Sequence, residues 1–256
     1  MHDFQRLRPA LGTLVAVDGV APSEAAANFA IEAAYGAIER VEALMHPTRS
    51  GSDLQRLSIA APGVAVTVDA WTFQLLRLAR ELHHRSQGMF EPCTADLPGR
   101  MMDIELREPH TVACYERVAL DLGGIAKGFA VDRAIEALLS CGCESGLVNA
   151  GGDLRAFGSD ARTLIVRVTD FAIARIELTA GALAVSAPRS DKSPPEHRGY
   201  YLGSTREQVP GRCVAVSAAA AAIADGLCKC AMLCPAPATE ALLGSYAARL
   251  IDIVEA

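Results

Sequence analysis

The stretch Leu120-Asp121-Leu122-Gly123-Gly124-Ile125-Ala126-Lys127-Gly128-Phe129-Ala130-Val131-Asp132 leads from a short apolar strand through two adjacent glycines into a helix. The first backbone N–H groups of a helix lack partners within it, and the positive end of the helix dipole lies at the same place. Such a turn suits a phosphate or a carboxylate, which glycine lets approach the backbone closely. The stretch Asp121–Gly128 therefore predicts a site for a phosphate-bearing nucleotide, with Lys127 adding a positive charge in the first turn of the helix.

This glycine-rich turn differs from two well-known phosphate-binding patterns. A Walker loop has a Ser or Thr directly after its lysine, whereas Lys127 is followed by Gly128. The spacing of the glycines also differs from G-x-G-x-x-G. A tight strand–helix turn with a solvated lysine would have the same sequence, so both interpretations stand on these residues alone.

A second glycine-rich turn, Asn149-Ala150-Gly151-Gly152-Asp153, separates the strand-like segments 146–149 and 154–157. Asn, Gly and Asp favour turns, and a short turn between two such segments predicts a β-hairpin. A plain hairpin turn explains the run. The alternative is a backbone that lies flat against a ligand, which would place Asn149, Gly151, Gly152 and Asp153 at a binding site.

Asp225 lies on an alanine-rich helix predicted over roughly residues 218–233, one turn before Lys229. Burying an unpaired carboxylate is costly, so this side chain needs a partner. On these residues alone an ion pair with Lys229 is the better interpretation. The alternative is a ligand for a hard metal ion.

The rest of the chain mixes helices and strands without a regular strand–helix–strand repeat, which favours the α+β class. The length of 256 residues suits one large domain or two small ones, and we expect a single mixed domain over residues 1–256. Capping and breaking residues set the predicted bounds. The expected elements are a strand over 11–20, a helix from Ser23 to Pro47, a strand over 64–68, a helix from Asp69 to Gly88, and strands over 118–120, 164–168 and 172–178.

Composition narrows the function classes. Hydrophobic residues make up 51% and charged residues 21%, which is typical of a globular chain. The net charge of -6 gives no electrostatic reason to bind nucleic acid. No stretch reaches the roughly 18 apolar residues of a transmembrane segment, and the N-terminus lacks the apolar run of a signal peptide. We therefore expect a cytoplasmic protein with no transmembrane segment and no nucleic-acid partner.

The eight cysteines are expected to be reduced and partly buried, as is usual in the cytosol. Cys228 and Cys230 resemble a metal cluster at first sight. On a helix they would point about 200° apart and could not share a metal ion.

Taken together, the runs 121–132 and 147–155 resemble the signature of the FAD:protein FMN transferases, the ApbE family. Weaker matches extend over nearly the whole chain. Gly12-Thr13 is similar to the family's first-strand Gly-Thr, and Phe90-Glu91-Pro92 to its Phe-Asp-Pro. The remaining similarities are Ser52-Asp53-Leu54-Gln55-Arg56-Leu57 to Ser-Glu-Leu-Ser-Arg-Leu and Ala224-Asp225 to the Ala-Asp metal motif.

The resemblance implies an antiparallel-sheet architecture flanked by helices and a defined chemistry. Such enzymes bind FAD with a divalent cation, usually Mg²⁺, and join FMN through a phosphoester to a Thr or Ser of a target protein, releasing AMP. By the match, the carbonyl of Ala126 and the carboxylate of Asp225 would be metal ligands. The candidate catalytic residues are Asp225, Lys229 and His197, the last for proton transfer. The nucleotide site would include Asp121, Gly123, Gly124, Ala126, Lys127, Asn149, Gly151, Gly152, Asp153, Met45 and Glu91.

Several positions depart from the family pattern. Lys229 stands where the family has a metal-binding Thr, and a protonated lysine cannot ligate a metal ion but can replace its charge. His197 is not followed by the family's Asp-Pro-Arg-Thr-Gly. The other departures are Thr48 in place of an aromatic residue, and Ala184-Val185-Ser186-Ala187-Pro188 in place of Ala-Thr-Ser-Gly.

Three hypotheses follow. The first is an FAD:protein FMN transferase with an altered metal site. The second is a non-catalytic paralogue that binds a flavin nucleotide with a degenerate metal site. The third is an enzyme that uses the same phosphate site for another nucleotide.

Overall fold

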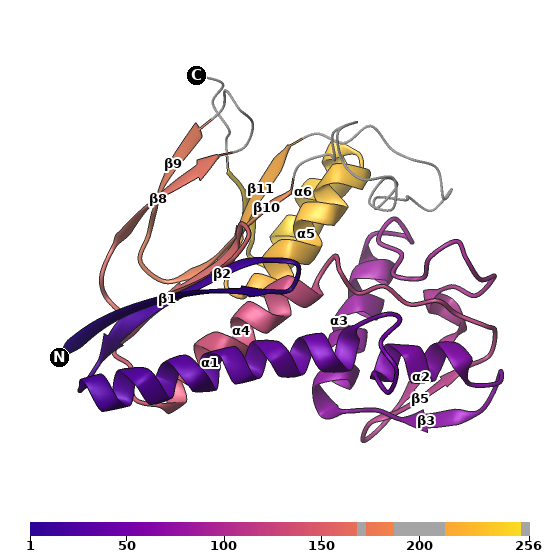
Figure 1. The fold of residues 1–256 in the computed structure, drawn as a ribbon. Coiled ribbons are helices and arrows are strands. Elements are labelled where there is room, and N and C mark those ends of the chain that lie inside the picture. Colours follow the sequence, from indigo (N-terminus) through magenta and orange to yellow (C-terminus); the bar gives the residue numbers. More distant parts are fainter. Residues whose placement is uncertain (168–172, 187–212, 252–256) are drawn as a thin grey trace.

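The computed structural model describes residues 1–167, 173–186 and 213–251. Its central feature is a seven-stranded antiparallel sheet in the order β1-β2-β6-β7-β10-β11-β12 (Figure 1). The strands of this sheet are β1 (His2–Ala10), β2 (Thr13–Ala21), β6 (Ser145–Ala150), β7 (Asp153–Phe157), β10 (Gly181–Ser186), β11 (Val214–Ala218) and β12 (Arg249–Leu250).

Three helices cover one face of this sheet and enclose the main core. They are α1 (Glu24–Met45), α4 (Ala126–Ser140) and α5 (Ala221–Leu233), and Figure 1 shows them together on one side of the strands. Because strand side chains alternate between faces, Val148 and Ala150 of β6 point into this core, together with Ile135 of α4. Packing on the same face of the sheet brings the starts of α4 and α5 close together.

The opposite face of the sheet is covered in part by a hairpin of β8 (Arg162–Arg167) and β9 (Ile173–Leu178). Leu147, Leu154 and Leu183 alternate with the residues of the main core and form a second, smaller cluster. Leu164 and Ile176 of the hairpin pack against that cluster. The sheet is therefore buried on both faces over its central strands.

A smaller sheet, β3-β5-β4, lies apart from the main sheet and packs against α2 and α3 (Figure 1). Its strands are β3 (Ala65–Thr67), β4 (Ile104–Arg107) and β5 (Thr111–Cys114). The other elements are α2 (Asp53–Ile59), α3 (Ala70–Arg85), the 3-10 helix η1 (Met101–Asp103) and α6 (Ala236–Ser245). None of the helices in the described ranges is long and apolar enough to cross a membrane.

The predicted helix caps are confirmed. The Ser23 hydroxyl accepts a hydrogen bond from the Ala26 N–H at 3.2 Å, and the Asp69 carboxylate accepts one from the Trp71 N–H at 2.9 Å. Helix α1 ends at Met45, two residues before Pro47. The α+β class and the antiparallel sheets flanked by helices are also as predicted.

Several predicted elements were wrong in detail. The strand expected over 11–20 is the second arm of a hairpin, because Leu11 and Gly12 form its turn with φ of 54° and 71°. Residues 118–120 contribute only an isolated bridge between Leu120 and Cys93. The helix expected from 218 starts at Ala221, since Val214–Ala218 pairs with β10 and β12.

Candidate functional site

The strand–helix turn is fixed by short hydrogen bonds of its own. The Asp121 carboxylate accepts one from the Gly123 N–H at 2.8 Å, so it shapes the turn. The Asp121 N–H donates to the Pro92 carbonyl at 2.9 Å, which brings the 90–92 segment against the turn. Helix α4 then begins at Ala126.

The first turn of α4 meets a carboxylate from within the protein. The Gly128 N–H donates to Oδ2 of Asp225 at 3.2 Å, and Asp225 belongs to α5. This is the favourable place for a negative charge at a helix N-terminus. Part of the negative charge expected at the start of this helix is thus the Asp225 carboxylate of the protein itself.

Two lysines and two aspartates come together at this point. Lys127 forms an ion pair with Oδ2 of Asp153, and Lys229 Nζ lies 2.8 Å from Oδ1 of Asp225. Lys229 also donates to the hydroxyl of Ser186 at 2.5 Å. We call Lys127, Asp153, Asp225 and Lys229 the lysine–aspartate cluster. Its two positive and two negative charges cancel.

Burial differs sharply within the cluster. Asp225 is fully buried, Asp153 and Lys229 are 1% and 7% exposed, and only the Lys127 side chain reaches solvent, with 34% exposure. Oδ1 of Asp153 is buried without a hydrogen-bond partner in the part of the chain that the structure describes. Lys127 is therefore the member through which an outside anion can be contacted.

Burial and neighbouring charges shift the pKa values of Asp153 and Lys127. Burial, together with the nearby charge of Asp225, raises the pKa of Asp153 to about 6. Burial alone would lower the pKa of Lys127, but the carboxylates of Asp225 and Asp153 outweigh it and raise that pKa. The Lys127 ammonium accordingly keeps its charge at neutral pH.

The raised pKa of Asp153 predicts a pH-dependent stability. The folded chain keeps the Asp153 proton up to about pH 6, whereas the unfolded chain loses it near the ordinary value of about 3.9. Stability therefore falls as the pH rises through this interval, by at most about 3 kcal/mol. Urea unfolding of the wild type and of Asp153→Asn at several pH values measures this. A wild type that gains stability relative to the variant over the same interval would contradict the assignment.

The residues expected to hold a metal do not fit a divalent cation. Of the pair Ala126 and Asp225, only Asp225 offers a charged ligand, and both of its oxygens already accept hydrogen bonds from nitrogen donors. The Lys229 ammonium stands beside it and would repel a metal ion. No group of three or more His, Cys, Asp or Glu side chains within the described ranges is placed to bind one.

The second glycine-rich turn closes the hairpin β6–β7 as predicted. The Asn149 side chain accepts a hydrogen bond from the Gly152 N–H at 3.0 Å, and Gly151 and Gly152 have φ of 66° and 104°. A Cβ on Gly151 would lie 2.7 Å from Oγ1 of Thr13. The turn thereby places Asp153 opposite Lys127 and brings the Gly12-Thr13 segment next to it.

Other predicted residues lie at the edge of the site or outside it. A Cβ on Gly124 would lie 3.4 Å from Cγ of Lys229, so this glycine packs on the lysine stem. The Glu91 side chain is buried, and its carboxylate accepts hydrogen bonds from the Cys93 and Met101 N–H groups, which fix its own loop. Met45 is buried in the main core at the end of α1. His197 lies outside the described residues.

Two residues of this region were not among the predicted site residues. Ser186, at the end of β10, accepts a hydrogen bond from Lys229. In the sequence its segment stands out only as a departure from the family pattern. Asp132 accepts hydrogen bonds from the Ala221 and Ala222 N–H groups at 2.9 Å and from Arg155 at 2.7 Å. In the sequence only its place at the end of the run 120–132 points to Asp132, because all of its hydrogen-bond partners are distant along the chain.

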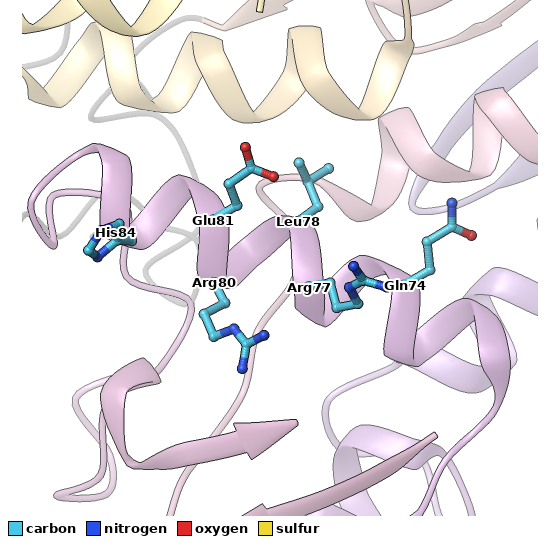
Figure 2. Close-up of a pocket in the computed structure, with 6 residues that line it drawn as sticks. All are labelled: Gln74, Arg77, Leu78, Arg80, Glu81 and His84. Carbon is cyan, nitrogen blue, oxygen red and sulfur yellow. The ribbon is translucent and has the colours of Figure 1, made fainter. Parts of the chain in front are cut away.

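A surface hollow of about 610 Å³ lies along α3, away from these residues. Figure 2 shows that the six residues lining it, from Gln74 to His84, all project from that one helix. It contains no member of the lysine–aspartate cluster. The hollow therefore contributes nothing to the candidate site.

The fold and the cluster define a class of α+β protein. Helices α4 and α5 and strand β7 of the antiparallel sheet bring two lysines and two aspartates together at a glycine-rich strand–helix turn. The model of the ApbE family matches residues 11–101 and 99–251. The chain therefore belongs to the ApbE family.

Individual relatives agree with this assignment. The FAD:protein FMN transferase of Treponema pallidum (strain Nichols) is 27% identical over 190 residues, 62% of this chain and 52% of that protein. That of Rhodobacter capsulatus is 28% identical over 175 residues, 57% of this chain and 33% of the relative. The matches thus span about half and a third of these relatives' own lengths. A mutant of the flavin transferase ApbE from Vibrio cholerae has the same fold, with a TM-score of 0.82 at 18% identity over 98% of this chain and 92% of that one.

Proposed function

We propose that this chain is an FAD:protein FMN transferase. The hydroxyl oxygen of a Thr or Ser on a target protein forms a new bond to the FMN phosphorus of FAD. The bridging P–O bond breaks, AMP leaves, and the hydroxyl proton is released. The observation that carries the proposal is the lysine–aspartate cluster at the turn 121–128, in a chain that belongs to the ApbE family.

The cluster suits this reaction because phosphoryl transfer depends mainly on positioning and charge stabilisation. Lys127 is the partly exposed positive group of the cluster and would contact the pyrophosphate. The turn of Gly123 and Gly124 would line the nucleotide site, and Asn149 holds the neighbouring hairpin turn in shape. His197 is proposed to accept the proton of the hydroxyl. The Mg²⁺ implied by the resemblance forms no part of this proposal, because the Asp225 carboxylate is already paired with Lys229.

The test is FAD binding to the purified chain, followed by chromatographic detection of AMP. Binding is read from quenching of flavin fluorescence. We expect FAD to bind and AMP to be released, and Lys127→Ala to weaken binding by roughly tenfold. Binding without AMP release would support the non-catalytic flavin-binding paralogue. If no FAD binds, the proposed function is wrong.

We further propose that residues 1–256 act as one domain and that the chain works in the cytoplasm. The support for the location is the cysteine chemistry. All eight cysteines lie within the described residues and outside disulfides, and burial raises the pKa of Cys228 to about 12. Thiols of this kind behave as small apolar side chains and suit a reducing compartment. Fractionation of cells that express the tagged chain tests the location.

A further inference from the structure

The position of Lys229 bears on how the site accepts a negatively charged nucleotide. Asp225 and Asp153 place two negative charges beside the turn where a pyrophosphate would bind. Without compensation they would repel it. Lys127 alone balances only one of them.

Lys229 supplies the second compensating charge from inside the protein. Its ammonium is 2.8 Å from Oδ1 of Asp225, and the hydroxyl of Ser186 accepts a second hydrogen bond from it. The side chain is only 8% exposed, and its stem lies against Gly124. The charge is therefore held at a fixed place directly behind the glycine-rich turn.

We propose that the Lys229 ammonium is the resident cation of this site, so that the chain binds a flavin nucleotide without a divalent metal. Lys229 neutralises Asp225, and Lys127 contacts the pyrophosphate. Lys229 is thus a positioning residue that acts through Asp225. This inference rests on the proposed function, since it concerns the same nucleotide.

The first experiment measures FAD binding by fluorescence quenching in EDTA and in excess Mg²⁺. We expect the wild type to bind FAD equally well in both. Lys229→Thr removes the charge, so binding in EDTA should weaken by roughly tenfold or more and recover in Mg²⁺. Lys229→Arg keeps the charge and should bind FAD in EDTA. Arg77→Thr, which removes an exposed positive charge from α3, is the matched control and should behave as the wild type.

A second experiment uses Mn²⁺ alone and needs no flavin. Mn²⁺ should leave the melting temperature of the wild type unchanged and raise that of Lys229→Thr, because a ligand that binds only the folded state stabilises it. If Lys229→Thr does not fold, Lys229→Gln, which keeps a long polar side chain without the charge, replaces it in the FAD assay.

The outcomes separate this inference from the proposed function. FAD binding by the wild type that requires Mg²⁺ would overturn the inference alone. So would wild-type Mn²⁺ binding that Asp225→Asn abolishes, or FAD binding in EDTA that survives the loss of the lysine. Absence of FAD binding in every variant and condition would refute the proposed function, and with it this inference.

Discussion

Gly128→Ala is expected to destabilise the chain by at least about 3 kcal/mol, a large share of the roughly 5 to 15 kcal/mol by which folded proteins are stable. A Cβ at this position would lie 2.3 Å from the Ala221 carbonyl oxygen and 2.6 Å from its carbon. Both atoms belong to backbone and cannot move aside as a flexible side chain would. The starts of α4 and α5 would have to separate, which would also break the Gly128–Asp225 hydrogen bond.

Gly36→Ala is the matched control for this substitution. Gly36 lies within α1, and a Cβ there would meet nothing within 4 Å. Alanine favours helix over glycine, so this variant should gain up to about 1 kcal/mol. Urea unfolding of both variants gives the comparison. Equal stabilities for Gly128→Ala and the wild type would show that α4 and α5 do not approach as closely as described.

Asp132→Ala is expected to cost about 3 kcal/mol, because two buried N–H groups lose their charged acceptor. Asp132 is 3% exposed and accepts hydrogen bonds from the first two N–H groups of α5 as well as from Arg155. Its removal leaves the buried N–H groups of Ala221 and Ala222 without a partner and removes a favourable charge at that helix start.

The control for the loss of stability in Asp132→Ala is a second aspartate that caps a helix but is more exposed to solvent. Asp69 caps α3 through the Trp71 N–H, and its side chain is 25% exposed. Asp69→Ala should cost only about 1 kcal/mol, as expected for an ordinary helix cap. Chemical unfolding of the two variants measures the difference. An Asp132→Ala variant no less stable than Asp69→Ala would mean that Asp132 does not hold the start of α5.

The parts of the fold that could be predicted have local causes. Helix α1 shows its cap at Ser23 and its stop at Pro47, and the hairpin β6–β7 shows its turn residues. Strand β1 lies at the edge of the sheet, where much of it is exposed, so it carries little apolar alternation to reveal it. The helix α6 was missed because a proline and a cysteine separate it from α5 without any clear cap.

In the candidate site too, contacts between residues close in the sequence could be predicted, and contacts between distant residues could not. The Asp225–Lys229 ion pair was predicted because residues four apart on a helix face each other. The Lys127–Asp153 pair joins a helix to a hairpin turn, and no pattern in either segment indicates its partner. Ser186 and Asp132 acquire their contacts only when distant strands and helices pack together, so their positions required the structure.

The residues of the lysine–aspartate cluster and their partners lie far apart in the sequence. Its hydrogen bonds span 26 residues between Lys127 and Asp153, 43 between Ser186 and Lys229, and 97 between Gly128 and Asp225. Contacts of such separation form after the local ones, because a long loop must close first. A nascent chain whose α5 is still inside the ribosome therefore has the glycine-rich turn but lacks Asp225 and Lys229. The complete lysine–aspartate cluster, and with it the proposed nucleotide site, therefore forms only after α5 has been synthesised and has packed against α4.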